Sequence, residues 1–140
     1  MGIIDWTECS DKKLIKEAKA DEFLIASLIK SSVKKMESCQ RLGLDETTAA
    51  SKISLAYDSL REMLEALALK QGFKVYNHEC FCAFLKTVLK EYLLAEDFDR
   101  FRKIRNSVNY YGKDIEVKEA KAVVAGIGKL RKEIESKYLK

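Results

Sequence analysis

The sequence has 140 residues, of which 47% are hydrophobic and 34% are charged, and it contains six glycines and no proline. A chain of this length can form one domain that buries roughly 70% of its unfolded surface, so its core needs no metal or disulfide. Its short apolar runs exclude a membrane span and a signal peptide, and we expect a cytoplasmic protein. The net charge of +4 is too small to indicate nucleic-acid binding by itself.

Apolar side chains that recur every three to four residues predict an all-α protein, an antiparallel bundle of about five to six helices in one domain over residues 1–140. Ser10 is expected to cap a short leading helix that includes residues 14–18. The second helix is expected from about Asp21 to Arg41, with Gly43 as its left-handed C-terminal stop.

The middle of the chain predicts the longest helix of the bundle. Asp45 is a suitable N-cap for it, and its apolar stripe ends near Gln71-Gly72. After a loop, Asn77 is expected to cap another helix, whose apolar residues continue to Tyr92. The linkers between these helices are short, which predicts antiparallel neighbours.

A final helix is expected from about Val117 to Lys137, and it contains the segment Gly126-Ile127-Gly128-Lys129. This segment lacks the third glycine of a dinucleotide fingerprint and the Ser or Thr that follows the lysine of a P-loop. It also lies within a helical pattern rather than after a strand. We therefore expect its small residues to allow close packing between helices or between two copies of the chain.

The four cysteines, Cys9, Cys39, Cys80 and Cys82, have spacings that match no zinc site. Cys80 and Cys82 would point about 200° apart on a helix, so they could not share a metal. The sequence therefore predicts four reduced, partly buried thiols, with no metal and no cofactor.

An arginine-led polar segment, Arg105-Asn106-Ser107-Val108-Asn109-Tyr110-Tyr111-Gly112, ends a helix that we expect to open at Asp97. The apolar face of this helix should pack into the bundle, and it comprises Phe98, Phe101, Ile104, Val108 and Tyr111. A polar stripe beside that face comprises Arg102, Arg105, Asn106 and Asn109. Guanidinium and carboxamide groups at the rim of a core suit a phosphodiester. The structural alternative is an ion pair of Arg105 with Asp97 or Glu96.

The charge of the chain is concentrated around this segment. Residues 97–113 contain five basic and two acidic side chains, a local charge of +3 within a net +4. Most of the net positive charge therefore lies on one predicted helix, although a run of charges is usually a solvated face.

Two earlier segments resemble a known family. The stretches Ala56-Tyr57-Asp58-Ser59-Leu60-Arg61-Glu62-Met63-Leu64-Glu65-Ala66-Leu67 and Lys70-Gln71-Gly72-Phe73-Lys74-Val75-Tyr76-Asn77-His78-Glu79 are similar to the centre of a HEPN domain, the small helical module of prokaryotic toxin-antitoxin and defence systems. The resemblance extends in helix order over residues 10–135. It implies a metal-independent endoribonuclease that works as a homodimer. In that family an Arg-x4-6-His motif from each chain meets in a cleft between protomers.

Arg105 and Asn106 match the start of this motif, whereas Tyr110, Tyr111 and Gly112 occupy the positions of its histidine. The family's imidazole takes the proton of a ribose 2′-hydroxyl, and its arginine stabilises the charge that develops on the phosphate. A tyrosine hydroxyl is a poor base, so phosphate binding and cleavage are separate expectations. The candidate catalytic residues are Arg105, Asn106 and Tyr110, and the candidate phosphate-binding residues are Arg102, Arg105 and Asn109.

His78 is the single histidine of the chain. At the start of a helix, such a residue is expected to hydrogen-bond the backbone of the preceding loop. It becomes a substitute base only if the fold brings it close to Arg105.

The resemblance leaves two functions open. The first is a toxin-antitoxin component that binds RNA or nucleotide phosphates at a dimer cleft, with or without cleavage, where Tyr110 or Tyr111 could stack on a base. The alternative is a catalytically inactive module that pairs with an MNT-type nucleotidyltransferase antitoxin, for which Tyr110 and Tyr111 are the candidate adenylylation sites. Structural alternatives are a Tyr111 that closes the core and an arginine stripe that serves only the dimer interface.

Overall fold

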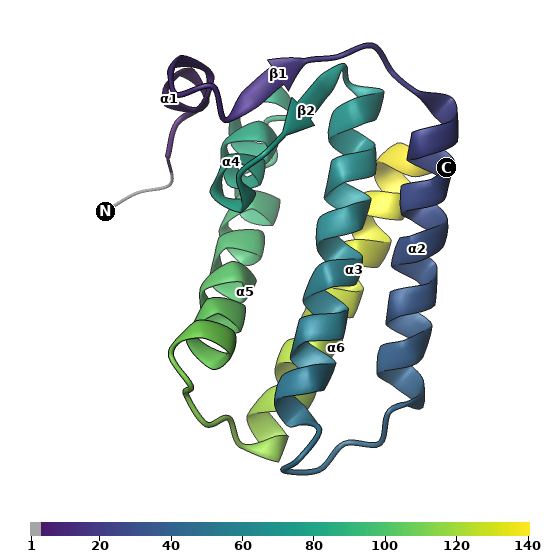
Figure 1. Cartoon of the computed structure of the whole chain (residues 1–140), viewed down its shortest axis with the longest axis vertical. Coiled ribbons are helices and arrows are strands. Elements are labelled where there is room, and N and C mark those ends of the chain that lie inside the picture. The colour runs from purple at the N-terminus through teal and green to yellow at the C-terminus, as the bar shows by residue number, and fades with distance from the viewer. Residues whose placement is uncertain (1–3) are drawn as a thin grey trace.

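The computed structural model describes residues 4–140, and its body is a bundle of four long helices (Figure 1). These helices are α2 (Glu22–Arg41), α3 (Ala49–Lys70), α5 (Tyr92–Tyr110) and α6 (Val117–Ile134). Helices that follow one another along the chain run in opposite directions (Figure 1). The prediction of an all-α antiparallel bundle is confirmed, with one small sheet added to it.

Short elements cover one end of the bundle. Strands β1 (Ile15–Glu17) and β2 (Phe73–Val75) pair antiparallel, with Ile15 opposite Val75. The remaining elements are α1 (Trp6–Asp11), α4 (His78–Ala83) and two π-helical turns, η1 (Phe84–Val88) and η2 (Glu135–Leu139). Strand β2, α4 and η1 connect α3 to α5, and the pairing of β2 with β1 positions the start of α4.

Helix α3 is the centre of the core and packs against α2, α5 and α6. Apolar side chains on several of its faces are fully buried, among them Tyr57, Leu60, Met63, Leu64 and Leu67. A helix that is apolar nearly all round must be covered by neighbours on most sides, which explains its central place.

The predicted N-cap Asn77 is confirmed, and the predicted start of the second helix at Asp21 is confirmed as a cap as well. The Asp21 carboxylate accepts a hydrogen bond from the backbone N–H of Leu24 at 3.0 Å, and α2 follows it directly. The Asn77 side chain accepts from the N–H of Glu79 at 2.8 Å and begins α4. A side-chain acceptor satisfies one of the four free N–H groups at a helix start, so both caps follow from the local sequence.

The predicted helix over residues 14–18 is wrong, and Ser10 lies inside α1 rather than before it. Lys13 has a left-handed φ of 58°, which ends the helical path. The following residues pair with β2, and this pairing is extended by a hydrogen bond from the Ala18 N–H to the Gly72 carbonyl at 2.9 Å. The partner strand is distant in sequence, so local periodicity could not reveal it.

Helix α2 ends at Arg41 as predicted, but the predicted capping roles of Gly43 and Asp45 are wrong. Helix α2 ends without a left-handed glycine, because Leu42 is its cap and Gly43 has no positive φ. Asp45 does not cap α3. Its carboxylate accepts from the N–H of Thr48 at 2.9 Å in the preceding turn, and Thr48 stands at the N-cap position.

Helix α5 begins five residues earlier than predicted. Lys90 has a φ of 60°, which separates η1 from α5, and Tyr92 opens α5. Asp97 therefore lies within the helix instead of opening it. The apolar periodicity runs through both helices, and only the backbone conformation at Lys90 divides them.

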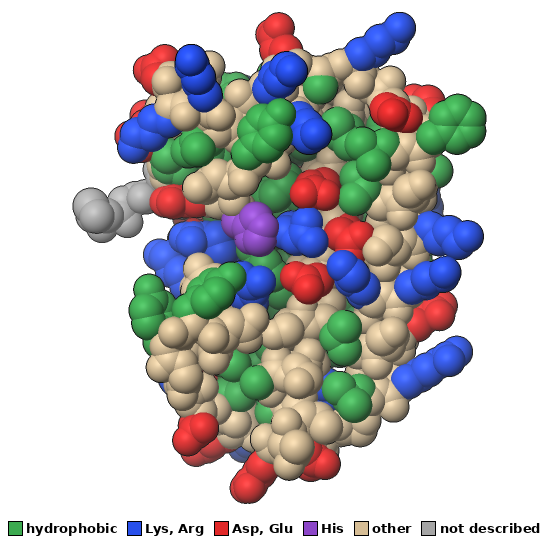
Figure 2. All heavy atoms as spheres, viewed as in Figure 1, with side chains coloured by type: hydrophobic (Ala, Val, Ile, Leu, Met, Phe, Trp, Pro, Cys, Tyr) green, Lys and Arg blue, Asp and Glu red, His purple; other side chains and the backbone are tan. Residues whose placement is uncertain are grey.

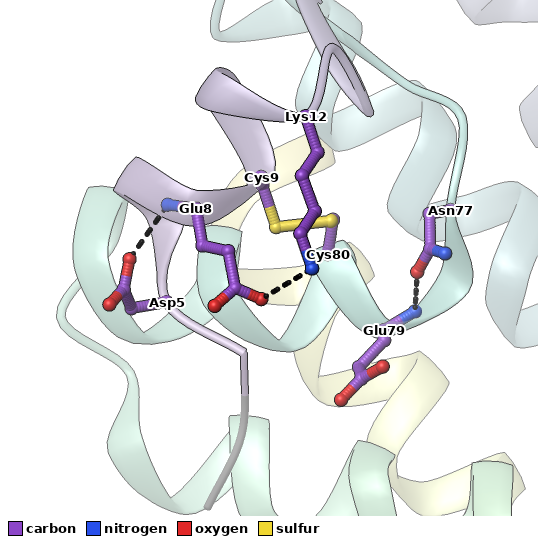
Figure 3. Close-up of a disulfide and its surroundings, with 7 residues drawn as sticks. All are labelled: Asp5, Glu8, Cys9, Lys12, Asn77, Glu79 and Cys80. Atoms are coloured by element: carbon purple, nitrogen blue, oxygen red, sulfur yellow. Dashed lines mark hydrogen bonds and ion pairs between the residues drawn. A yellow bond between two sulfur atoms is a disulfide. The ribbon is translucent and has the colours of Figure 1, made fainter.

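A disulfide joins Cys9 of α1 to Cys80 of α4, with Cα atoms 6.1 Å apart (Figure 3). The prediction of four reduced thiols is wrong for this pair, because the β1–β2 pairing brings two distant segments together. Cys39 and Cys82 are free and buried, as predicted.

The glycines of α6 differ in their surroundings. A Cβ at Gly126 would lie 2.8 Å from the ring of Phe101 on α5, so the predicted close packing of helices is confirmed there. A Cβ at Gly128 would meet no atom within 4 Å, so packing within the chain does not explain that glycine. Within residues 4–140, every helix is too short or too polar to cross a membrane.

Candidate functional site

Polar side chains from three elements meet on the face between α3 and α5, next to the start of α4. Tyr57 and Arg61 come from α3, His78 comes from α4, and Arg102 and Arg105 come from α5. Figure 2 shows this face, with the histidine in purple and Lys or Arg side chains in blue on both sides of it. The site therefore combines one imidazole with several cations.

His78 is held by a side chain rather than by the loop backbone that the sequence suggested. Its Nδ1 lies 3.1 Å from the hydroxyl oxygen of Tyr57. Partial burial, together with the charges of Arg61 and Arg105, lowers the pKa of His78 to about 4. The imidazole is therefore neutral near pH 7, which is the form that can accept a proton.

Arg105 lies on aromatic rings and, within residues 4–140, has no carboxylate partner. Its guanidinium carbon is 5.1 Å from the centre of the Tyr57 ring and 5.2 Å from that of Tyr110. Its Nη1 donates to the Tyr110 hydroxyl at 3.0 Å and to the Asn106 side-chain oxygen at 3.3 Å. Its Nε is buried with no hydrogen-bond acceptor within the described chain. The alternative of an ion pair with Asp97 or Glu96 is wrong: Arg105 lies within 4.0 Å of neither carboxylate, and Asp97 pairs with Arg100.

Tyr57 connects the histidine to the arginine. It is fully buried and stacks on Phe98, with ring centres 5.7 Å apart. Burial raises the pKa of Tyr57, so its hydroxyl stays protonated and hydrogen-bonds His78 while its ring supports Arg105. One rigid side chain therefore fixes the imidazole and the guanidinium relative to each other.

Arg102 is neutralised by a neighbouring carboxylate. Its Nε and Nη2 donate to Asp99 Oδ1 at 3.2 and 2.8 Å, and Lys103 Nζ lies 3.1 Å from Asp99 Oδ2. Burial raises the pKa of Asp99, but the hydrogen bonds from Arg102 and Lys103 outweigh it and the net shift is downward. Arg102 is therefore less available to a phosphate than Arg105.

The structure brings the predicted catalytic residues Arg105, Asn106 and Tyr110 together through Nη1 of Arg105. Asn109 is turned toward α3, where its side-chain oxygen accepts from the Ser54 hydroxyl at 2.9 Å. The polar stripe of α5 therefore faces α3. Arg102 and Asn109 are engaged by Asp99 and Ser54, so Arg105 is more available to a ligand than they are.

The two tyrosines at the end of α5 are both exposed. Tyr110 is 66% and Tyr111 is 82% exposed, so the expectation that Tyr111 packs into the bundle is wrong. Helix α5 ends at Tyr110, and Gly112 takes a left-handed φ of 64°, which directs the chain away from the core. Both hydroxyls are accessible to another macromolecule.

Sequence reasoning missed Tyr57 as a site residue. It lies in the apolar stripe of the longest helix, where a tyrosine reads as core. The available signal was its polar hydroxyl, because a buried tyrosine usually finds a hydrogen-bond partner. His78, the single histidine of the sequence, was one candidate for that partner.

The site has neither a reactive thiol nor, among the described residues, a group of metal ligands. Burial, and then the charge of Asp99, raises the pKa of Cys82 to about 12, so this thiol is not a nucleophile at neutral pH. Among the residues that the structure describes, no three His, Cys, Asp or Glu side chains form a group that could hold a metal ion.

Comparison with known proteins gives no relative: no protein family, curated protein or solved structure matches this chain.

Proposed function

We propose that this protein is the HEPN-like component of a toxin-antitoxin pair and that its Arg105 site binds phosphates of single-stranded RNA. The observation that supports this proposal most is the guanidinium of Arg105, which lies on two aromatic rings without a carboxylate partner. A phosphate oxygen would neutralise its charge and compete with the Asn106 and Tyr110 oxygens for its Nη1. The exposed rings of Tyr110 and Tyr111 are available for stacking on bases.

RNA binding is measured by fluorescence anisotropy with a short labelled single-stranded RNA. We expect Arg105→Ala to weaken binding by about tenfold or more, because one charged phosphate contact is lost. The salt dependence of binding should also become shallower by roughly one phosphate contact. Arg100→Ala is the matched control, since Arg100 lies on the same helix, is exposed and pairs with Asp97. An equal loss of affinity in both variants would reject the Arg105 site.

A second candidate function is cleavage of the bound RNA without a metal, with His78 as base. The observation in its favour is a neutral imidazole fixed beside Arg105 by Tyr57. In this reaction the ribose 2′-oxygen bonds to phosphorus, and the bond from phosphorus to the 5′-oxygen breaks. His78 takes the 2′-hydroxyl proton at Nε2, while its Nδ1–H donates to the Tyr57 oxygen. Arg105 stabilises the charged phosphorane, and the Tyr110 hydroxyl donates a proton to the leaving oxygen.

Cleavage is assayed in EDTA by mass spectrometry of the products, which should end in a 2′,3′-cyclic phosphate. His78→Asn should lose cleavage and keep RNA affinity, whereas Arg105→Ala should lose both. Intact RNA after incubation with the wild-type protein would reject cleavage and leave the binding proposal to its own test.

The alternative function is an inactive module that pairs with an MNT-type nucleotidyltransferase and is adenylylated by it. The high exposure of the Tyr110 and Tyr111 side chains favours this alternative. Incubation with the transferase encoded next to it and ATP should add the mass of an adenylate, and Tyr110→Phe with Tyr111→Phe should abolish the addition. Failure of the two proteins to associate would reject this function.

The proposal includes a homodimer, in which two Arg105 sites line a common cleft, and a cytoplasmic location. Light scattering on the purified chain measures the dimer, and a monomer at micromolar concentration would contradict it. Stable disulfides are rare in the reducing cytoplasm. A Cys9–Cys80 bond that persists in cells lysed with a thiol-trapping reagent would therefore contradict the location.

A further inference from the structure

A second basic region lies on a different part of the molecule, in a groove of about 440 Å³ between α2 and α6. Met36 and Gln40 of α2 form one wall, and Gly128, Lys129 and Lys132 of α6 are on the other. Arg131 also lines this groove. Its volume lies in the range of small-molecule sites.

Arg131 is buried with part of its hydrogen-bonding capacity unused. The residue is 6% exposed, and its Nε donates to the Ser32 hydroxyl at 2.9 Å. Its Nη2 has no hydrogen-bond acceptor among residues 4–140, and the nearest carboxylate oxygen, of Glu135, is 3.8 Å away. Because the nearest carboxylate compensates this buried charge only at 3.8 Å, an anion in the groove that Arg131 lines would be favourable.

The guanidinium is held rigidly before any ligand arrives. The Ser32 hydroxyl that accepts from it donates in turn to the Ser59 backbone carbonyl at 2.6 Å, and the Ser59 hydroxyl donates back to the Ser32 carbonyl at 2.6 Å. These bonds tie α2 to α3 and fix the position of Arg131 on α6. A preorganised donor loses little freedom when it binds.

Two further cations and one glycine complete the groove. Lys129 and Lys132 are exposed, and neither has a carboxylate within ion-pair distance in the described part of the chain. Gly128 leaves open space where any other residue would place a side chain. The groove therefore joins three positive charges to an apolar wall that includes Met36 and Val124.

We propose that this groove binds a nucleoside monophosphate, with its phosphate on Arg131, Lys129 and Lys132 and its base against Met36 and Val124. A phosphate monoester supplies several acceptors and a charge of about −2, which suits one guanidinium and two ammonium groups near one carboxylate. A purely inorganic ion would leave the apolar wall uncovered. The site lies between α2 and α6, apart from the Arg105 site between α3 and α5, and does not depend on the RNA-binding proposal.

The experiment is isothermal titration of the full chain with AMP and, separately, with inorganic phosphate. We expect AMP to bind at least about tenfold more tightly than phosphate, since only AMP uses the apolar wall. Gly128→Leu should abolish AMP binding by filling the groove, and it should not unfold the chain because leucine favours a helix more than glycine does. Lys129→Glu with Lys132→Glu should also weaken binding by about tenfold or more.

Lys121→Ala is the matched control, because Lys121 is an exposed lysine of α6 outside the groove and should bind AMP like the wild type. Unchanged AMP binding in Gly128→Leu, or equal affinity for AMP and phosphate, would overturn the proposal. The absence of any heat of binding at millimolar AMP would overturn it as well.

Discussion

The guanidinium groups of Arg105 and Arg131 have different kinds of neighbours in the same bundle. Each group has one buried nitrogen without an acceptor within the described residues, Nε in Arg105 and Nη2 in Arg131. Arg105 lies on the ring of Tyr57 at the exposed edge between α3 and α5. Arg131 is tied to the Ser32 hydroxyl between α6 and α2.

The neighbours of an arginine determine how far the free energy of unfolding falls when it is replaced. An aromatic ring supports a cation without neutralising it, so Arg105 keeps its charge for a ligand. A hydroxyl cluster that links three helices makes Arg131 part of the fold. We therefore expect changes near Arg131 to affect stability more than changes near Arg105, and the following predictions test this comparison.

The largest expected effect comes from the Cys9–Cys80 disulfide. It anchors α4, which carries His78 of the Arg105 site, and neither cysteine lines the α2–α6 groove. Replacing Cys9 and Cys80 by serine should lower the free energy of unfolding by about 4 kcal/mol, because a long loop is no longer closed in the unfolded chain. Urea unfolding measures the loss. Dithiothreitol should destabilise the wild type and leave the double variant unchanged, and equal midpoints for all samples would refute the prediction.

The next effect compares the two arginines directly. Arg131→Ala should lower the free energy of unfolding by about 2 kcal/mol, because it removes a buried hydrogen bond to Ser32 and leaves a cavity. Arg105→Ala should cost about 1 kcal/mol, since it loses mainly its contact with the Tyr57 ring. Both values come from urea unfolding at one pH. A larger loss for Arg105→Ala would break the comparison.

A smaller effect is expected from Tyr57→Phe, which keeps the ring under Arg105 and removes the hydroxyl that bonds His78. The free energy of unfolding should fall by about 1 kcal/mol, the usual net contribution of one hydrogen bond. RNA affinity should persist, because the support of Arg105 is retained. Loss of RNA binding in this variant would show that the position of the imidazole matters for phosphate binding.

A separate effect, which appears only at acidic pH, is the pH dependence that His78 gives to stability. Its pKa in the folded protein, about 4, is below the ordinary value of 6.5, so the folded state holds fewer protons between these values. The contribution of His78 is fully present above about pH 6.5 and is lost as the pH falls toward 4. Thermal unfolding across this range should show a steeper loss for the wild type than for His78→Asn, and parallel curves would contradict the shift.

Much of the fold can be predicted from local sequence. The predictions that are wrong concern features that local sequence does not determine. The caps at Asp21 and Asn77 are local hydrogen bonds, so the starts of α2 and α4 could be predicted. Strand β1 could not, because its partner β2 is far along the chain. The split at Lys90 depends on a left-handed backbone in a residue that carries no signal for it.

The same limit applies to the candidate site. The stripe with Arg105 and Asn106 lies on one helix, so helical spacing predicts it. The approach of His78 depends on how α3 and α4 pack, and Tyr57, which joins the two, looks like an ordinary core residue. Tyr111 was assigned to the core because the helical pattern extends one residue beyond the true end of α5.

The Cys9–Cys80 bond also changes the connectivity of the molecule. It makes residues 9–80 a closed covalent ring that contains α2, α3 and the turn between them, with residues 81–140 as a tail. A protease cut within residues 42–48 would leave the two pieces linked until the disulfide is reduced. A cut within residues 111–116 would release α6 from the denatured chain at once. After a single cut between α2 and α3, the disulfide still links both helices covalently. After a cut before α6, only noncovalent packing holds α6 in the bundle.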